Sequence, residues 1–197
     1  EKKEPLLKGR EKNFYIKEMP SFYNYMAYMY FCGSAISGPW FEYKDLYDFM
    51  RAQGHYERVH DISTFRQSME KFGLSWVCVI VGTIIGELGF DLGHFVEPAF
   101  GTYSLPYQFL YIWMVMQREW MIVMIGFLLM DSSIIMTGLS MSKINDEKKE
   151  ELIEAEHDRV KNLEIIKLYK SRCVSDLLTH WNMSTQAWLK YYVYVRM

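Results

Sequence analysis

The sequence has little cysteine, little net charge and no repetitive segment. Its 197 residues include three cysteines that are scattered without paired spacing, so we expect neither a disulfide nor a metal site. The formal net charge is only −2, which gives no reason to expect a nucleic-acid partner. There are no internal repeats and no low-complexity tract. A disulfide scaffold, a nucleic-acid-binding protein and a repeat protein are therefore not expected.

The two ends of the chain lack the usual start and stop signals. The first residue is Glu1, and no pattern of charged, apolar and small residues typical of a signal peptide follows it. The last residues, 191–197, continue an apolar aromatic helix without a cap, Gly or Pro to stop it. We interpret the chain as an internal piece of a longer polypeptide.

The apolar residues are abundant and unevenly distributed. Half of the chain is hydrophobic and 17% is aromatic, yet the mean hydropathy is only −0.11. The apolar residues form blocks separated by densely charged stretches, as in a membrane protein with sizeable loops. The fold class predicted is therefore all-α, a multi-pass transmembrane helical bundle in which charged loops dilute the average hydropathy.

The blocks predict where the chain crosses the membrane. Residues 73–90 form the clearest span. Residues 107–141 are interrupted only by Gln117-Arg118-Glu119 and by Asp131, and we expect one long or broken span there. The tyrosine-rich segment 20–38 is either spanning or interfacial. Residues 142–180 form a charged connection, and 181–197 begin another apolar helix.

Basic residues predict the orientation of the chain. The loops 40–72 and 142–172 are rich in Lys and Arg, whereas 91–106 contains neither, so the first two should be cytoplasmic and the third luminal. This arrangement requires an odd number of crossings between 107 and 141, most simply one. Within the second loop, 146–170 has one apolar side among many charges and is expected to form a helix, either on the membrane surface or as a solvated connector.

A polar residue stands near the start of the last apolar block. On a helix, Asn182 would share a face with Thr185 and Gln186, beside a second face with Trp181 and Trp188. An amide in an apolar helix needs a partner, since an unsatisfied one costs on the order of a few kcal/mol. Either other protein groups satisfy Asn182, or its amide is kept for a ligand.

Three stretches in order resemble the membrane-bound O-acyltransferase family. The pattern Trp-Asn-x-x-Thr-x-x-Trp-Leu-Lys, from Trp181 to Lys190, is similar to the asparagine motif of that family, and its wording is closest to the lysophospholipid acyltransferases. Pro20-Ser21 followed by Gly38-Pro39-Trp40-Phe41-Glu42-Tyr43 is similar to an earlier family segment. Thr137-Gly138-Leu139 and the run Arg159-Val160-Lys161-Asn162-Leu163-Glu164 resemble the connection that precedes the asparagine helix.

The resemblance implies a reaction and a site. It implies transfer of a fatty acyl group from acyl-CoA to the hydroxyl of a lysophospholipid in endoplasmic-reticulum-like membranes, with acyl-CoA as co-substrate, no further cofactor and no metal. Asn182 would be the catalytic asparagine, beside a tunnel through the bilayer. The substrate-binding residues implied are Glu42, Tyr43, Trp181, Thr185, Gln186 and Trp188.

The family also employs a histidine as general base on a separate apolar helix after the asparagine motif. None of the five histidines follows Asn182, and His157 and His180 lie in or beside the charged connection. We therefore expect the chain to be inactive by itself. His55 and His60, which are loosely spaced like metal ligands, are better interpreted as part of a solvated loop.

Several alternatives stay open at this point. Glu42 and Tyr43 could stabilise the turn after Gly38-Pro39 instead of lining a tunnel. The acceptor could be a sterol, a diacylglycerol or a protein, or the protein could be a non-catalytic subunit of a membrane complex or form a homo-oligomer. Arg118 is expected to pair with Glu119 or Asp131 rather than to bind a phosphate.

Overall fold

The computed structural model describes residues 14–16, 18–33, 38–144 and 155–195, and this part of the chain is mostly helical. Its elements, in chain order, are α2 (Phe22–Met29), α3 (Tyr43–Met50), η1 (Gly54–Tyr56), η2 (Val59–Asp61), α4 (Phe65–Glu87), α5 (Leu92–Phe95), η3 (Pro98–Thr102), α6 (Leu105–Thr137), β1 (Lys143–Ile144), β2 (Ala155–Glu156), α7 (Ile165–Lys170), α8 (Val174–His180), α9 (Met183–Trp188) and the π-helical η4 (Leu189–Tyr194). The strands β1 and β2 form one short antiparallel pair.

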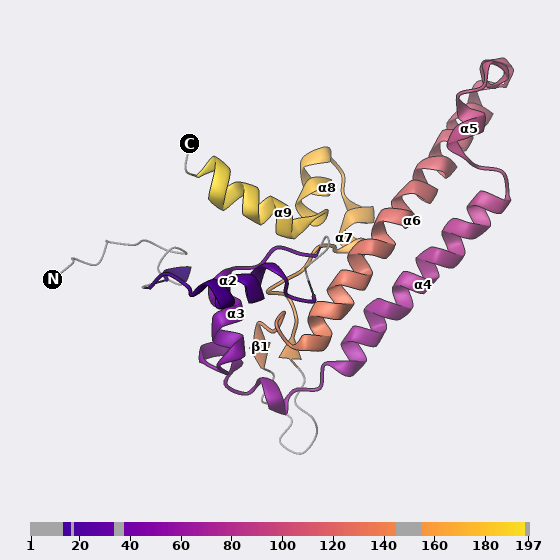
Figure 1. Ribbon diagram of the computed structural model, residues 1–197. Helices are drawn as coiled ribbons and strands as arrows, with labels where there is room; N and C mark the ends of the chain where they lie inside the picture. Colours follow the sequence, from indigo (N-terminus) through magenta and orange to yellow (C-terminus); the bar gives the residue numbers. More distant parts are fainter. Residues whose placement is uncertain (1–13, 17, 34–37, 145–154, 196–197) are drawn as a thin grey trace.

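Two long helices, α4 and α6, pack side by side as an antiparallel hairpin that extends away from the rest of the molecule (Figure 1). Small residues let them approach: a Cβ added to Gly82 would lie 3.4 Å from the Cβ of Met121. Near the other end of α4, the buried hydroxyls of Ser68 and Ser132 lie 2.9 Å apart, and each also donates to the other residue's backbone carbonyl. The hairpin is therefore held by close backbone approach and by hydrogen bonds between serines.

The two hairpin helices are long and apolar enough to cross a membrane. With 23 and 33 residues, they are about 35 and 50 Å long, against a hydrocarbon core of about 30 Å. The expected boundaries need correction, since the first helix covers 65–87 rather than 73–90 and the second covers 105–137 rather than 107–141. The second helix is one continuous piece, and it ends at Gly138 in the left-handed conformation (φ 87°).

The loops sort to opposite ends of the hairpin. The segment 91–106, which has no base, forms α5 and η3 at the far tip, whereas α3 and β1 lie at the other end (Figure 1). Although Tyr169 of α7 contacts Gln117 and Trp120 farther along α6, the loop 40–64 and the residues directly after α6 lie at the same end. This is the arrangement that a single crossing by α6 requires, and the side of the membrane that each end faces stays a prediction.

The tyrosine-rich helix α2 is too short to cross a bilayer. It has eight residues, which gives a length of about 12 Å. Ser21 caps its first turn by accepting a hydrogen bond from the backbone N–H of Asn24. The described part of 20–38 therefore contains only this short helix, and its place in or on the membrane stays a prediction.

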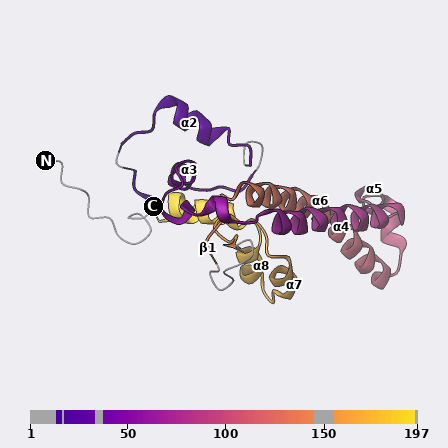
Figure 2. The same ribbon diagram turned by 90° about the horizontal axis from the view of Figure 1, so that it is seen from below.

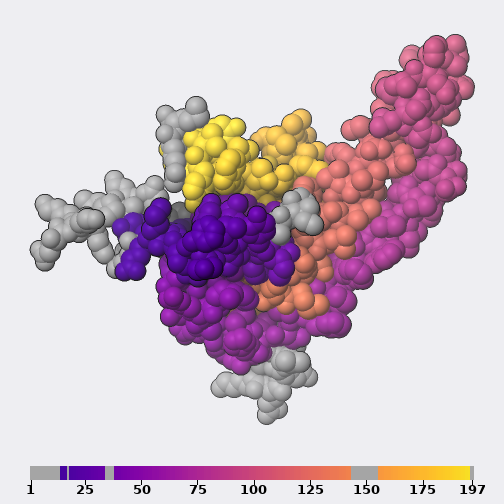
Figure 3. Space-filling view, in the orientation of Figure 1, coloured from indigo at the N-terminus to yellow at the C-terminus, as the bar shows by residue number. Residues whose placement is uncertain are grey.

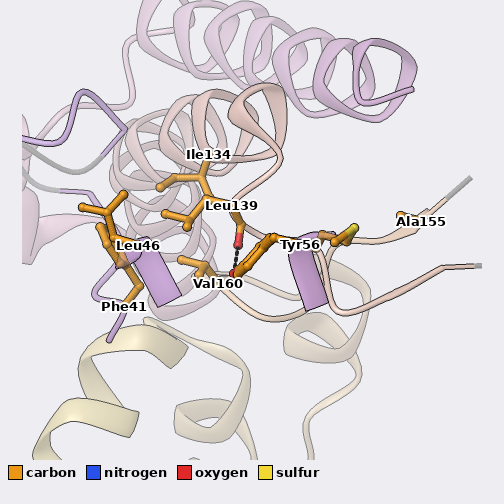
Figure 4. Close-up of a cluster of buried hydrophobic side chains, with 8 residues drawn as sticks. Phe41, Leu46, Tyr56, Ile134, Leu139, Ala155 and Val160 are labelled. Carbon is orange, nitrogen blue, oxygen red and sulfur yellow. Dashed lines mark hydrogen bonds between the residues drawn. The ribbon is translucent and has the colours of Figure 1, made fainter. Parts of the chain in front are cut away.

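A compact hydrophobic cluster joins α3, the end of α6 and the connection that follows (Figure 4). Its buried members are Phe41, Leu46, Tyr56, Ile134, Leu139, Met141, Ala155 and Val160. The hydroxyl of Tyr56 donates to the carbonyl of Leu139 at 2.8 Å. Beside the cluster, the guanidinium of Arg159 donates to the nearly buried carboxylate of Asp45 at 2.5 and 2.8 Å. Segments far apart in sequence are thus fixed to one another here.

The connection after α6 does not form the helix that we expected over 146–170. Residues 145–154 lie outside the described part, 155–156 pair as a strand, and a helix appears only at Ile165–Lys170. The reason is that tertiary partners take the backbone donors: the N–H of Arg159 bonds the carbonyl of Ser140, and the N–H of Asn162 bonds Asp131. Amphipathic spacing alone did not reveal these partners.

The connection then passes along α6 to the C-terminal helices. Seen from below, α2 lies on one side of the long hairpin and α7 and α8 on the other (Figure 2). On the face shown in Figure 3, α9 and η4 lie along the surface of the region 20–50. The segment 181–194, which contains Asn182, α9 and η4, is therefore placed between α6 and the N-terminal part of the described chain.

Candidate functional site

Asn182 occupies a turn rather than a helical position. It is the residue before α9, with φ 50° and ψ 49°, and it is half-buried. Asparagine is one of the few residues that adopt this left-handed conformation readily. Its carbonyl accepts from the N–H of Gln186, while its side chain makes no capping hydrogen bond. The expectation that Asn182 shares a helical face with Thr185 and Gln186 is therefore wrong, because the helix begins one residue later.

The residues on both sides of Asn182 are tied to the connection. Trp181 forms an isolated antiparallel bridge with Leu163. The N–H of Met183 donates to the carbonyl of Asn162 at 3.0 Å, and the hydroxyl of Ser184 donates to Oδ1 of Asn162 at 2.6 Å. The N–H of Asn162 in turn donates to the carboxylate of Asp131 in α6 at 3.1 Å.

Sequence reasoning missed the part that Asp131 and Asn162 play. Both are almost completely buried, at 2% and 1% exposed. Asp131 stands out in the sequence as an acid inside an apolar helix, but we expected it to pair with Arg118, if with any residue. The structure instead pairs Arg118 with Glu119 at 3.7 Å, as the other alternative had it.

The indole of Trp181 packs against α6. Its ring lies 5.8 Å from that of Trp120 and 5.4 Å from that of Phe127, and it belongs to the same cluster as buried Leu163. Such ring pairs stabilise packing through burial and favourable edge contacts. The structure thus gives Trp181 a packing role that anchors the turn, whereas we expected a substrate contact.

The remaining residues expected from the motif are spread over the surface of α9. The side chain amide of Gln186 donates to the carbonyl of Trp181 at 3.3 Å, so it closes the turn on itself. Thr185 is exposed and Trp188 is 41% exposed. Their contact with substrate, like the tunnel beside Asn182, stays a prediction.

Glu42 lies against the helix that follows the asparagine. Its carboxylate is buried and accepts a hydrogen bond from the hydroxyl of Tyr192 at 2.6 Å, across 150 positions in sequence. The ring of Trp40 packs edge-on against the ring of Tyr192 at 5.5 Å. The structure therefore joins Glu42 to the helix that follows Asn182, and a contact of Glu42 with substrate stays a prediction.

Tyr43 faces a different region. Its ring lies 5.7 Å from that of Tyr28, and it lines a cavity of about 740 Å³ between the start of the described chain and α3. Lys44 and Arg51 also line this cavity. Burial raises the pKa of Tyr28 to about 12, and its hydroxyl donates to the carbonyl of Phe41. Tyr43 and Glu42 are neighbours in sequence, but they contact different partners.

Two histidines of the connection have structural partners. Nδ1 of His180 lies 2.9 Å from the carboxylate of Glu164, which also accepts from Lys161 and Lys167. Burial raises the pKa of Glu164, but the hydrogen bonds and charges of the two lysines outweigh it and lower the pKa to about 2.

Nδ1 of His157 lies 2.8 Å from the hydroxyl of Ser140, and burial lowers the pKa of His157. His55 and His60 are exposed, in agreement with a solvated loop. Within the residues described, no group of three or more His, Cys, Asp or Glu side chains could hold a metal ion.

Comparison with known proteins identifies the family. The family model described as membrane-bound O-acyltransferase matches residues 6–197. The chain belongs to this family. Lysophospholipid acyltransferase 2 of Arabidopsis thaliana is 29% identical over 202 residues, which cover 99% of this chain and 42% of the relative. The resemblance expected from the Trp-Asn motif is thereby confirmed.

Further relatives carry the same description. Lysophospholipid acyltransferase 1 of Arabidopsis thaliana is 27% identical over 100% of this chain and 42% of its own length. A lysophospholipid acyltransferase of Schizosaccharomyces pombe is 24% identical over 96% of this chain and 37% of its own length. This membrane-bound O-acyltransferase chain thus spans about two fifths of the length of the curated relatives that it matches.

Proposed function

We propose that the protein containing this chain transfers a fatty acyl group from acyl-CoA to the free hydroxyl of a lysophospholipid in the endoplasmic reticulum membrane. Membership of the family and the names of the relatives support the reaction class. The observation that carries the proposal is the position of Asn182. The amide sits in a left-handed turn whose flanking residues are both fixed, and its side chain is not used to cap the helix.

The chemistry explains why such an amide is needed. The hydroxyl oxygen of the lysophospholipid attacks the thioester carbonyl carbon, the C–S bond breaks, and the CoA thiolate leaves and takes up the proton. An alcohol is a poor nucleophile, so a general base must remove its proton. The family implies a histidine for this step, and none of the histidines of this chain follows Asn182. Asn182 supplies an N–H donor for the oxyanion that forms on the carbonyl oxygen.

Glu42 and Tyr192 would shape the substrate side of the site. Their hydrogen bond joins the second half of η4 to the residue before α3, which ties the polypeptide after Asn182 to the region 40–50. A fixed wall next to the reacting groups excludes water, which would otherwise hydrolyse the thioester. Glu42 would therefore contribute by holding this part of the site in place through its hydrogen bond to Tyr192.

The test is acyl transfer by the full-length protein in membranes, with labelled acyl-CoA and a panel of acceptors. The panel contains lysophospholipids of several head groups, a sterol and a diacylglycerol. We expect product with a lysophospholipid. Transfer to the sterol or the diacylglycerol alone, or to none of the acceptors, would overturn the proposal.

Asn182 itself is tested with two substitutions. Asn182→Ala removes the amide, and Asn182→Asp keeps its shape and its tolerance of the left-handed turn but removes the N–H donor. Loss of one oxyanion donor costs about 100-fold or more in turnover, and we expect this from both variants at unchanged protein amount. Gln53→Ala, which removes an exposed side-chain amide before η1, is the control and should retain full activity. Wild-type turnover in Asn182→Asp would exclude the donor role.

A further inference from the structure

We propose that Asp131 and Asn162 are positioning residues that aim the amide of Asn182, so that the long helix α6 sets the geometry of the reaction centre. The inference rests on the proposed function, because it assigns these residues an effect on turnover through Asn182. The residues Asp131, Asn162 and Ser184, with the hydrogen bonds that join them, are called the asparagine clamp below.

The first link of the asparagine clamp runs from α6 to the connection. The carboxylate of Asp131 accepts the backbone N–H of Asn162, with N···O distances of 3.1 and 3.4 Å to its two oxygens. Both residues are nearly inaccessible, at 2% and 1% exposed. A hydrogen bond away from water is electrostatically stronger than one exposed to solvent. The connection is therefore fixed in register with α6 at this point.

The second link runs from the connection to the start of α9. Asn162 accepts twice, from the N–H of Met183 at its carbonyl and from the hydroxyl of Ser184 at Oδ1. Ser184 is also buried, at 7% exposed. Since Met183 and Ser184 directly follow Asn182, these bonds fix where the turn leaves the catalytic position.

The preceding side of the turn is fixed by neighbouring residues. Leu163 pairs with Trp181 in the isolated bridge, and Trp181 packs on Trp120 of α6. Asn182 therefore lies between two residues that are both bound to the pair 162–163. Its backbone is held on both sides, so the place from which its amide projects depends on the position of Asn162.

The burial of a polar side chain at Asn162 supports a role beyond stability. Nδ2 of Asn162 is buried and has no hydrogen-bond partner among the described residues. A leucine of similar volume would avoid this cost, which is about 1–3 kcal/mol for a buried unsatisfied donor. The side chain is instead used for one acceptor contact, to Ser184, next to the catalytic turn. That contact fixes the position of Ser184 and, through it, of Asn182.

The experiment measures steady-state kinetics of the full-length protein with labelled acyl-CoA and its lysophospholipid acceptor. Ser184→Ala removes the hydroxyl from the asparagine clamp, and we expect kcat to fall about 10-fold or more, since misplacement of a reacting group by about 1 Å can cost 100-fold. The KM values for both substrates should stay within about twofold, because the interaction lost acts in the transition state. Ser133→Ala, at an exposed serine of α6 outside the asparagine clamp, is the matched control.

A second pair of variants separates positioning from folding. Asp131→Ala removes the acceptor for the N–H of Asn162, whereas Asp131→Asn keeps an oxygen at the same place. We expect Asp131→Asn to restore most of the turnover lost in Asp131→Ala. If Asp131→Ala does not accumulate, Ser184→Ala and the Asp131→Asn variant still decide the question.

The proposed function and this inference fail differently. Unchanged turnover in Asn182→Asp would overturn the role of the amide and, with it, the asparagine clamp. An inactive Asn182→Asp together with normal kcat in Ser184→Ala would overturn the asparagine clamp alone. A loss confined to KM, or one that follows protein amount, would also overturn it. A further loss of less than about twofold when Ser184→Ala is added to Asn182→Asp is the expected sign that both act through one group.

Discussion

The hairpin of α4 and α6 and the connection between Ser140 and Trp181 are built by different kinds of interaction. The hairpin follows from long apolar segments, and much of its outer surface carries exposed side chains such as Phe109 and Trp113. The described residues of the connection before α7 form only the short strand pair β1–β2, and they are held by hydrogen bonds and an ion pair to distant residues. Apolar packing thus forms the hairpin, and specific polar contacts position the candidate site around Asn182 against it.

The comparison predicts that one ion pair of the connection matters more than one on the hairpin. In Arg159→Met, the carboxylate of Asp45 stays buried without its partner, and we expect the free energy of unfolding to fall by about 3 kcal/mol. Arg118→Met on the hairpin removes a half-exposed pair with Glu119 and should cost at most about 1 kcal/mol. Thermal unfolding of the purified protein in detergent measures both.

Replacing both partners sharpens this result. Asp45→Leu combined with Arg159→Met removes the uncompensated charge and should recover much of the lost stability. Equal effects of Arg159→Met and Arg118→Met would show that the connection is no more dependent on its polar contacts than the hairpin.

A smaller effect is expected where the hairpin meets the connection. Gly138 has φ 87°, and an added Cβ would lie 2.8 Å from Cγ2 of Val59, so Gly138→Ala should cost about 2 kcal/mol. Gly126→Ala, in the interior of α6, meets only Met130 Cε at 3.9 Å and should instead stabilise by about 0.5–1 kcal/mol. Opposite signs in the melting temperature are the expected outcome, and a destabilised Gly126→Ala would contradict the packing of α6.

The smallest effect concerns pH. The pKa of Glu164 is lowered to about 2 from an ordinary value of 4.5, so its stabilising contribution is complete above about pH 4.5 and is lost as the pH falls towards 2. Glu164→Gln should lower stability by about 1 kcal/mol at pH 7. The difference from the wild type should shrink as the solution is acidified below pH 4.5. A difference that does not change over this range would mean that the lysines do not hold the carboxylate.

Sequence reasoning predicted what depends on local pattern. Long apolar runs gave two helices, with boundaries that were displaced because charged residues such as Arg66 and Lys71 continue α4 beyond its apolar part. The Trp-Asn motif predicted the family, which the family model confirms.

Contacts across long sequence separations could not be predicted. Asp131 and Asn162 are 31 positions apart and Asn162 and Ser184 are 22 apart, and no periodicity connects them. The start of α9 after Asn182 and the irregular backbone of 157–164 depend on these bonds. The expected helix over 146–170 failed for the same reason, because helical spacing does not show that a distant group has taken a backbone donor.

The left-handed turn at position 182 restricts which amino acids evolution can place there. Glycine accepts the backbone conformation but has no amide, and glutamine has the amide but is poorly suited to a positive φ. Aspartate accepts the conformation but offers a charge instead of a donor. Asparagine alone among these four meets both demands, so the local bend of the polypeptide and the chemistry at its tip are selected as one trait.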